Sequence, residues 1–276
     1  MRKLNAMTRI GIGWRPEIAL LVEEQQCDFV EIVAENFWNE RQLPSALKRL
    51  VDLGVTIIPH GISLSLGGAD EPDAWRIDKL AKLAQKLGAP YVSEHIALVR
   101  GGGYESGHLL PVERTEEMLE IVVENVRIAQ RGLPVPLVLE NIATLTEWDG
   151  PGQMSEGEFV TRLLDETGAG LLLDVANLHA NCYNHKRCHN EFLNTIPLHK
   201  IVYVHVAGGV YRDRLYHDTH AHPLQKAPLA ILRDLCSRVA PQAVLLERDE
   251  HFGNFAEIAA ELHQVRDIVT KATVGA

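Results

Sequence analysis

Histidine and carboxylate residues stand at the ends of short apolar runs in this sequence of 276 residues. The chain holds 13 histidines against 4 cysteines. Histidine is costly to bury but useful for binding metals and moving protons. The residues that end such a run, or lie in the loop after one, are His60, His95, Glu140, Asp174, His205, Asp218, His220 and Glu247. We take these eight residues as the candidate site.

A shared metal site would explain all of these residues at once. Carboxylates that pack together raise one another's pKa unless a cation neutralises them. Imidazole and carboxylate ligands without organised thiolates suit divalent iron, manganese or zinc. One ion that leaves room for a substrate takes about three or four protein ligands. Eight candidates therefore indicate two ions or three, with Glu140 or Asp174 as a bridge. Asn177 is a further candidate ligand, with a capping role as the alternative.

The elements that must position these residues alternate along the chain. Eight short runs rich in Val, Ile and Leu are typical of buried parallel strands. They span residues 9–14, 29–34, 56–60, 91–95, 137–140, 170–174, 201–206 and 243–247. Amphipathic stretches that predict helices follow them, at residues 16–26, 44–53, 74–87, 113–130, 155–167, 191–196, 228–239 and 255–269.

Eight strand–helix units predict an α/β fold, a single (β/α)8 TIM barrel over residues 1–276. A doubly wound open sheet is the alternative, which is disfavoured because no G-x-G-x-x-G motif follows the first strand. Residues 61–73, 100–111, 178–187 and 207–223 are expected to be irregular. All four segments follow the C-terminal ends of strands, where barrels place their sites.

Composition excludes several classes of protein. The net charge of −10 argues against the basic surface of a nucleic-acid-binding protein. No stretch approaches the roughly 18 apolar residues of a membrane span, and residues 1–9 lack the apolar core of a signal peptide. We expect a cytoplasmic protein with no nucleic-acid or membrane partner. Disulfides are not expected, and the spacing of Cys182 and Cys188 is unusual for a zinc site.

Nine motifs in sequence order resemble the multinuclear non-heme iron-dependent oxidative enzymes. They are GIGWRPE (11–17), VEIVAENFW (30–38), PHGISLSLGG (59–68), VSEHIA (92–97), LENIA (139–143), LLLDVANLHAN (171–181), VHVAGG (204–209), HDTHAHPL (217–224) and LLERD (245–249). Together they span nearly the whole chain, so the resemblance is more specific than any single motif.

The resemblance implies a barrel that holds two or three iron ions in mixed Fe²⁺ and Fe³⁺ states, with dioxygen as co-substrate. It implies oxidative modification of a ribosomally synthesised precursor peptide, most often at cysteine, with a small partner protein that binds the precursor leader. Carried over by motif, the eight candidates and Asn177 are the expected iron ligands. Apart from the resemblance, Glu94 and Arg15 are candidates to orient these ligands, with a structural ion pair as the alternative for each. His179 stands where many relatives carry another residue, so no ligand role is predicted for it.

Three other functions remain open for the sequence. Metal-dependent sugar isomerases and endonuclease-like barrel enzymes also gather histidines and carboxylates at strand ends. A non-catalytic iron-binding subunit of a biosynthetic complex would carry the same ligands without turnover.

Overall fold

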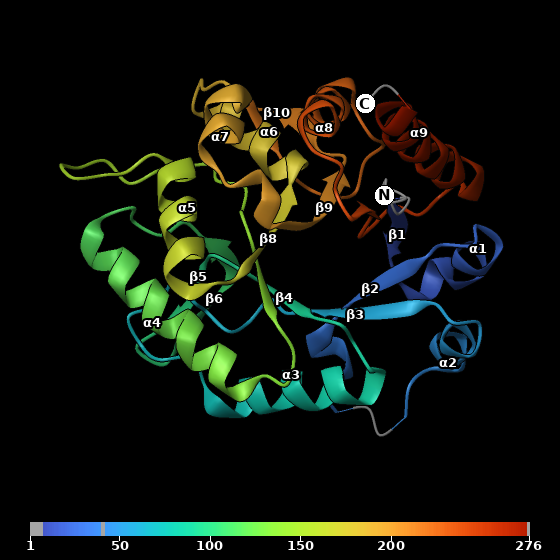
Figure 1. The fold of residues 1–276 in the computed structure, drawn as a ribbon, viewed down its shortest axis with the longest axis horizontal. Helices are drawn as coiled ribbons and strands as arrows, with labels where there is room; N and C mark the ends of the chain where they lie inside the picture. The colour runs from blue at the N-terminus through green and yellow to red at the C-terminus, as the bar shows by residue number, and fades with distance from the viewer. Residues whose placement is uncertain (1–7, 40–41, 275–276) are drawn as a thin grey trace, which may run out of the picture.

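Eight parallel strands close into a barrel in the computed structural model, which describes residues 8–39 and 42–274 (Figure 1). The order around the barrel is β1-β12-β9-β8-β7-β4-β3-β2. The strands are β1 (Arg9–Gly13), β2 (Phe29–Val33), β3 (Thr56–His60), β4 (Val92–His95), β7 (Leu137–Glu140), β8 (Gly170–Asp174), β9 (Ile201–Ala207) and β12 (Ala243–Glu247). The predicted TIM barrel is confirmed, and each predicted strand agrees to within one residue at either end.

Helices cover the outside of the barrel. They are α1 (Ala19–Glu24), α2 (Ser45–Asp52), α3 (Ala74–Leu87), α4 (Glu116–Gly132), α5 (Glu156–Thr167), α7 (His189–Thr195), α8 (Lys226–Arg238) and α9 (Phe255–Val274). The helix predicted over residues 16–26 is divided, because a 3-10 turn over Pro16–Ile18 precedes α1. A second 3-10 turn, Ala34–Phe37, follows β2, and a third, Leu198–Lys200, precedes β9.

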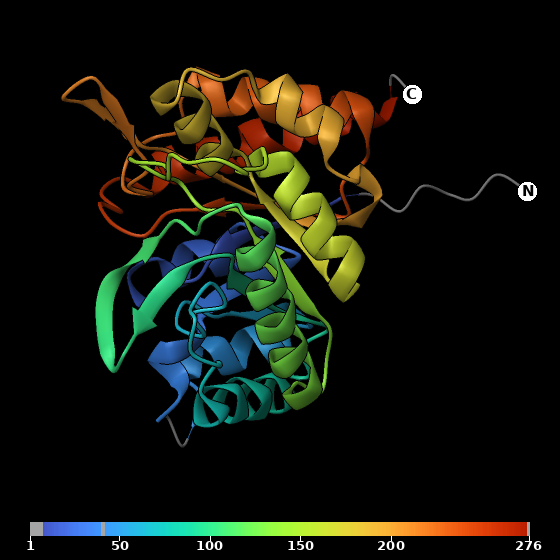
Figure 2. The ribbon, with the colours of Figure 1, turned by 90° about the vertical axis from the view of Figure 1, so that its left-hand side faces the viewer.

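Three of the four segments expected to be irregular contain regular structure, so those predictions were wrong. Residues 178–187 lie largely in helix α6 (Val175–Asn184), whose start is capped by the Asp174 carboxylate. Residues 100–111 belong to a hairpin of β5 (Leu98–Gly101) and β6 (Tyr104–Leu110). Residues 207–223 include a hairpin of β10 (Val210–Arg212) and β11 (Leu215–His217). Figure 2 shows both hairpins, green and orange, extending from one end of the molecule.

The barrel interior holds a layer of large side chains beneath the strand ends. Phe29, Ile58, Tyr91, Leu172 and Tyr203 form part of this buried cluster. Such a packed interior is a core and not a pore, so access to the strand ends is from the C-terminal face alone.

Several expectations of location and chemistry can also be compared with the structure. Among the described residues, no helix is long and apolar enough to cross a membrane. Cys27 and Cys236 are buried, and all four cysteines are free thiols. Residues 1–7 lie outside the described residues, and with them most of the segment expected to lack a signal peptide.

Candidate metal centre

The eight predicted residues gather at the C-terminal ends of the strands. Six of them end or nearly end strands β3, β4, β7, β8, β9 and β12, and the other two lie in the loop after β11. Among the described residues, ligand atoms of seven of them, together with Asp249, form three groups with the spacing that a metal ion requires. Asp218 belongs to none of the three groups.

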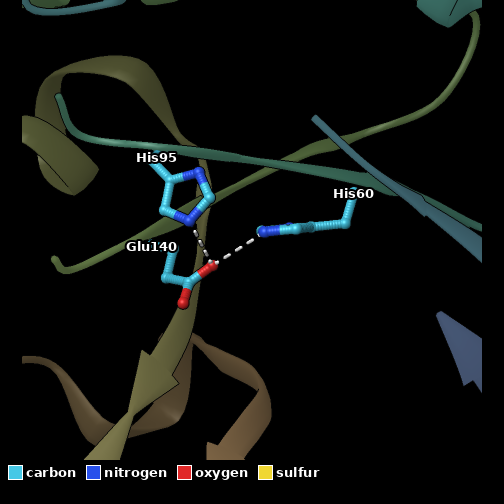
Figure 3. Close-up of side chains that lie close together, drawn as sticks. All are labelled: His60, His95 and Glu140. Atoms are coloured by element: carbon cyan, nitrogen blue, oxygen red, sulfur yellow. Dashed lines mark ion pairs between the residues drawn. The ribbon is translucent and has the colours of Figure 1, made fainter. Parts of the chain in front are cut away.

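The first group joins two imidazoles to one carboxylate. Nε2 of His60 and Nε2 of His95 each lie 3.4 Å from Oε2 of Glu140 (Figure 3). All three side chains are buried. Both rings therefore direct one nitrogen toward the same oxygen.

The second group lies beside the first and shares Glu140 with it. Nδ1 of His205 lies 3.5 Å from Oε1 of Glu140, 3.9 Å from Oδ2 of Asp174 and 2.9 Å from Oε2 of Glu247. Glu140 thus presents one oxygen to each group. This is the arrangement of a bridging carboxylate, which the sequence predicts for Glu140 or Asp174.

The third group shares Glu247 with the second and includes a residue that the sequence prediction missed. Nδ1 of His220 lies 3.3 Å from Oε2 of Glu247 and 3.7 Å from Oδ2 of Asp249, while its Nε2 lies 2.5 Å from Oδ2 of Asp218. Asp249 follows the end of β12 by two residues, inside the LLERD motif. An acidic residue so close to the end of a strand could have identified Asp249 as a candidate ligand.

Buried polar atoms without partners indicate that these groups fit metal ions. Within the part of the chain that the structure describes, five buried atoms have no well-aligned hydrogen bond: Oε2 of Glu140, Oδ2 of Asp174, Nδ1 of His205, Nε2 of His220 and Oε2 of Glu247. Unsatisfied buried atoms are costly and rare in native proteins. Here these atoms face one another in small groups, and all of them are imidazole nitrogens or carboxylate oxygens, which are common metal ligands. A cation in each group would satisfy them.

The charges of the groups shift one another's pKa strongly. Burial, reinforced by Asp218, raises the pKa of Asp174 to about 7. Burial alone would lower the pKa of His95, but the charges of Glu140 and Glu94 outweigh it and raise this pKa to about 9. Crowded carboxylates hold protons in this way when no cation neutralises them.

Asp174 and Asn177 divide the capping and ligand roles. Oδ1 of Asp174 accepts hydrogen bonds from the backbone N–H groups of Ala176 (2.6 Å) and Asn177 (2.8 Å), while its Oδ2 faces His205 and His220. Nδ2 of Asn177 donates to the carbonyl oxygen of Asn141 at 2.9 Å. The helix cap is therefore Asp174, and the ligand role of Asn177 stays a prediction.

Glu94 and Arg15 contact the candidate ligands or their loops. Glu94, which is buried, accepts hydrogen bonds from the backbone N–H groups of Ser63, Leu64 and His95. It thereby anchors the loop after β3 beside His60. Arg15 forms an ion pair with Asp249. These contacts are those expected of residues that orient ligands, and the two roles stay predictions.

A cavity of about 780 Å³ opens above the three groups. Its floor includes His60, His95 and Glu247, and its walls include Ile62 and Leu145. Ligand pockets commonly measure about 300–1,000 Å³. His179 does not line this cavity, and its Nε2 lies 3.0 Å from the hydroxyl of Tyr211.

Fold and site together define a TIM-barrel protein with buried histidine and carboxylate clusters suited to metal ions. Comparison with known families identifies it further. Residues 9–270 match the model of the family described as RiPP precursor modification enzyme MbnB/TglH/ChrH, where RiPP denotes a ribosomally synthesised and post-translationally modified peptide. The chain belongs to this family.

Curated relatives support the same assignment. A UPF0276 protein of Streptomyces avermitilis is 52% identical over 99% of this chain, and the chain spans 58% of that relative's length. A UPF0276 protein of Caulobacter vibrioides is 31% identical, with 95% of each chain covered.

Solved structures show the fold alone, because their sequence identities are low. Endonuclease IV from Thermus thermophilus has a TM-score of 0.59 at 20% identity, covering 95% of this chain and 99% of its own. A xylose isomerase domain protein from Planctomyces limnophilus has a TM-score of 0.63 at 12% identity, covering 97% and 99%.

Proposed function

We propose that the protein is an iron- and dioxygen-dependent oxidase that modifies a ribosomally synthesised precursor peptide, with cysteine as the target residue. The observation that carries this proposal is the sharing of carboxylates. Glu140 belongs to the first and second ligand groups, and Glu247 to the second and third. The three groups are therefore connected through shared carboxylates, which supports a multinuclear centre of two or three ions.

Each group would hold one ion through residues of this chain. His60, His95 and Glu140 would hold the first, and Glu140, Asp174, His205 and Glu247 the second. His220, Glu247 and Asp249 would hold the third through Nδ1 of His220. Asp218 would act at the other ring nitrogen of His220, and Asn177 would add a carbonyl oxygen. Iron, when bound, supplies dioxygen activation, one-electron chemistry and an acceptor for the substrate thiolate.

The chain itself positions the peptide and limits access of water. The cavity has room for a peptide segment, and its apolar walls include Ile62, Leu110 and Leu145. Beneath it, the candidate ligands are nearly all buried on a packed layer of large side chains. A substrate side chain that reaches the floor would leave bulk water behind, which strengthens electrostatic interactions there.

A small partner protein that binds the precursor leader belongs to the same proposal. Exposed aromatic side chains on the same face support it: Tyr104 on the first hairpin is 82% exposed, and Trp148 and Tyr211 are each 50% exposed. Aromatic residues are enriched in protein interfaces.

Anaerobic purification followed by metal analysis and Mössbauer spectroscopy tests the proposal. We expect two or three iron ions per chain, and dioxygen consumption when a precursor peptide is added. The precursor to use is one encoded beside this gene by a short, cysteine-containing reading frame, together with any small partner encoded there. Mass spectrometry then locates the modified residue.

Three outcomes would contradict the proposal. Zinc that iron cannot replace with gain of activity would exclude the oxidase. Turnover of a sugar with manganese or magnesium in the absence of dioxygen would indicate an isomerase. Iron binding without dioxygen consumption, when the precursor and its partner are both present, would indicate a non-catalytic subunit.

A further inference from the structure

A buried hydrogen-bond network lies beneath the candidate metal centre and connects two of its histidines. The hydroxyl of Tyr203 lies 2.6 Å from Oε2 of Glu31 and 2.7 Å from Oγ of Ser93. Ser93 in turn lies 2.8 Å from Nδ1 of His60, and Glu31 lies 3.1 Å from Nε2 of His205. Glu31 is 3% exposed, and Ser93 and Tyr203 are fully buried. All three side chains are therefore shielded from bulk water.

The chemistry of the groups determines the direction of each hydrogen bond. A carboxylate only accepts, so Tyr203 and Nε2 of His205 both donate to Glu31. A phenol has a single proton, and Tyr203 donates it to Glu31. In the contact between Tyr203 and Ser93, the serine hydroxyl must therefore donate and the Tyr203 oxygen accept. Ser93 also has one proton, and the remaining contact therefore requires Nδ1 of His60 to donate.

The two histidines consequently present opposite nitrogens to the metal groups. With hydrogen on Nδ1, His60 turns a bare Nε2 toward Glu140, 3.4 Å away. With hydrogen on Nε2, His205 turns a bare Nδ1 toward Glu247, 2.9 Å away. A bare nitrogen next to a carboxylate oxygen is unfavourable unless a cation lies between them.

We propose that Glu31, Tyr203 and Ser93 are positioning residues that fix the hydrogens of His60 and His205, so that Nε2 of the first and Nδ1 of the second are available to metal ions. The inference rests on the proposed metal centre but not on the reaction catalysed there. Partners that orient ligating histidines in this way raise metal affinity about 10- to 100-fold. One network would thus prepare a ligand in each of two neighbouring groups.

Glu31 escapes sequence prediction because it lies inside a strand and not at its end. It interrupts the apolar run of β2 at a fully enclosed position. A lone carboxylate in such a run needs a buried partner. This requirement could have identified Glu31 as part of a buried polar network.

The substitution Tyr203→Phe tests the network, and Tyr91→Phe is its matched control. The two rings lie in the same buried layer with centroids 5.4 Å apart, but among the described residues the Tyr91 hydroxyl forms no hydrogen bond with a member of the network. We expect Tyr203→Phe to weaken Fe²⁺ and Zn²⁺ binding about 10- to 100-fold, and Tyr91→Phe to leave it within about threefold. Thermal unfolding of the metal-free variants checks that both fold.

A second measurement determines which ring nitrogen of His60 and of His205 carries a hydrogen. In zinc-loaded protein labelled with ¹⁵N at histidine, we expect His60 to carry hydrogen on Nδ1 and His205 on Nε2. The buried N–H of His205 should exchange slowly with water, and Glu31→Leu should make that exchange fast. If Tyr203→Phe does not fold, Ser93→Ala removes the acceptor of His60 and should weaken binding to a similar extent.

Equal metal affinity of the Tyr203→Phe and Tyr91→Phe variants, or hydrogens on the other nitrogens, would overturn the inference. The wild-type protein separates this inference from the proposed function. If it binds metal but does not oxidise the peptide, the proposed function fails and the network can still be tested by affinity. If it oxidises the peptide and Tyr203→Phe binds metal equally well, the network alone is refuted.

Discussion

Nδ1 of His205 and Oε2 of Glu247 lie 2.9 Å apart, and among the described residues neither atom has a well-aligned hydrogen bond. Two metal–ligand bonds of about 2.1 Å that meet at a right angle place their donor atoms about 3 Å apart. The two atoms therefore have the spacing of neighbouring ligands of one ion. They come from the adjacent parallel strands β9 and β12, where His205 is in register with Leu245, two residues before Glu247.

Glu140→Gln should remove more metal than any substitution at the edge of the centre. Glu140 belongs to two ligand groups, whereas Asp249 belongs to one. We expect Glu140→Gln to lower the metal content by more than one ion per chain, and Asp249→Asn by at most one. Elemental analysis of anaerobically purified protein measures both, with Asp213→Asn on the exposed second hairpin as the control. Full occupancy in Glu140→Gln would refute the bridging role.

Asp218→Ala should lower iron occupancy through the loop after β11. Oδ2 of Asp218 lies 2.5 Å from Nε2 of His220, whereas Nδ1 of the same ring faces Glu247 and Asp249. Asp218 therefore holds the His220 ring in the orientation that presents Nδ1 to the third group. His220→Ala should give a similar loss. Thr219→Ala is the control in the same loop, since Thr219 contacts His222 instead. Unchanged iron content in both test variants would remove this loop from the centre.

Glu94→Gln should destabilise the metal-free protein by about 2 kcal/mol, because a carboxylate that accepts from three backbone N–H groups is replaced by an amide. The amide nitrogen cannot accept, so at least one buried N–H loses its partner. Urea unfolding measures the free energy of unfolding, and the exposed Glu24→Gln provides the comparison. Equal stability of the two variants would contradict the anchoring role of Glu94.

Glu156 should make stability depend on pH in a second cavity, of about 380 Å³, beside α5 and α6. Burial raises the pKa of Glu156 to about 7, although Arg114 and Asn181 oppose the shift and Glu147 adds to it. Since the folded pKa exceeds the unfolded value, this contribution is fully present below about pH 4.5 and is lost as the pH rises through 7.

The substitution Glu156→Gln removes that dependence. Relative to the wild-type protein, the variant should gain about 1–3 kcal/mol between pH 5 and pH 8. Urea unfolding of both proteins across this range provides the measurement. Parallel stability curves for the two proteins would show that Glu156 does not titrate as expected.

The strand ends and the site residues upon them could be predicted because one pattern encodes both. An apolar run predicts a buried strand, and the first charged residue or histidine that interrupts it marks the barrel mouth. His60, Glu140, Asp174 and Glu247 are each the last residue of their strand. The barrel then brings these ends together, whatever their distance along the chain.

The remaining elements depend on contacts that no local pattern reveals. Helix α6 has little amphipathic periodicity, and its start is stabilised by Asp174, a residue that also looks like a metal ligand. In the hairpin of β5 and β6, four residues of β6 (106–109) lie opposite the single residue Val99 of β5, so the strand does not alternate regularly. Glu31 and Asp249 were missed because each lies away from the last residue of its strand.

Asp174 places two demands on a single side chain. One oxygen holds the start of α6, and the other faces the imidazoles of the centre. Serine and threonine, the usual evolutionary substitutes at a helix start, would keep the cap but provide no carboxylate for an ion. Glutamate would keep the charge but place it one methylene farther from the helix. We therefore expect few other residues to be tolerated at this position, because a substitution that keeps the helix cap loses the ligand oxygen, and one that keeps the charge displaces the cap.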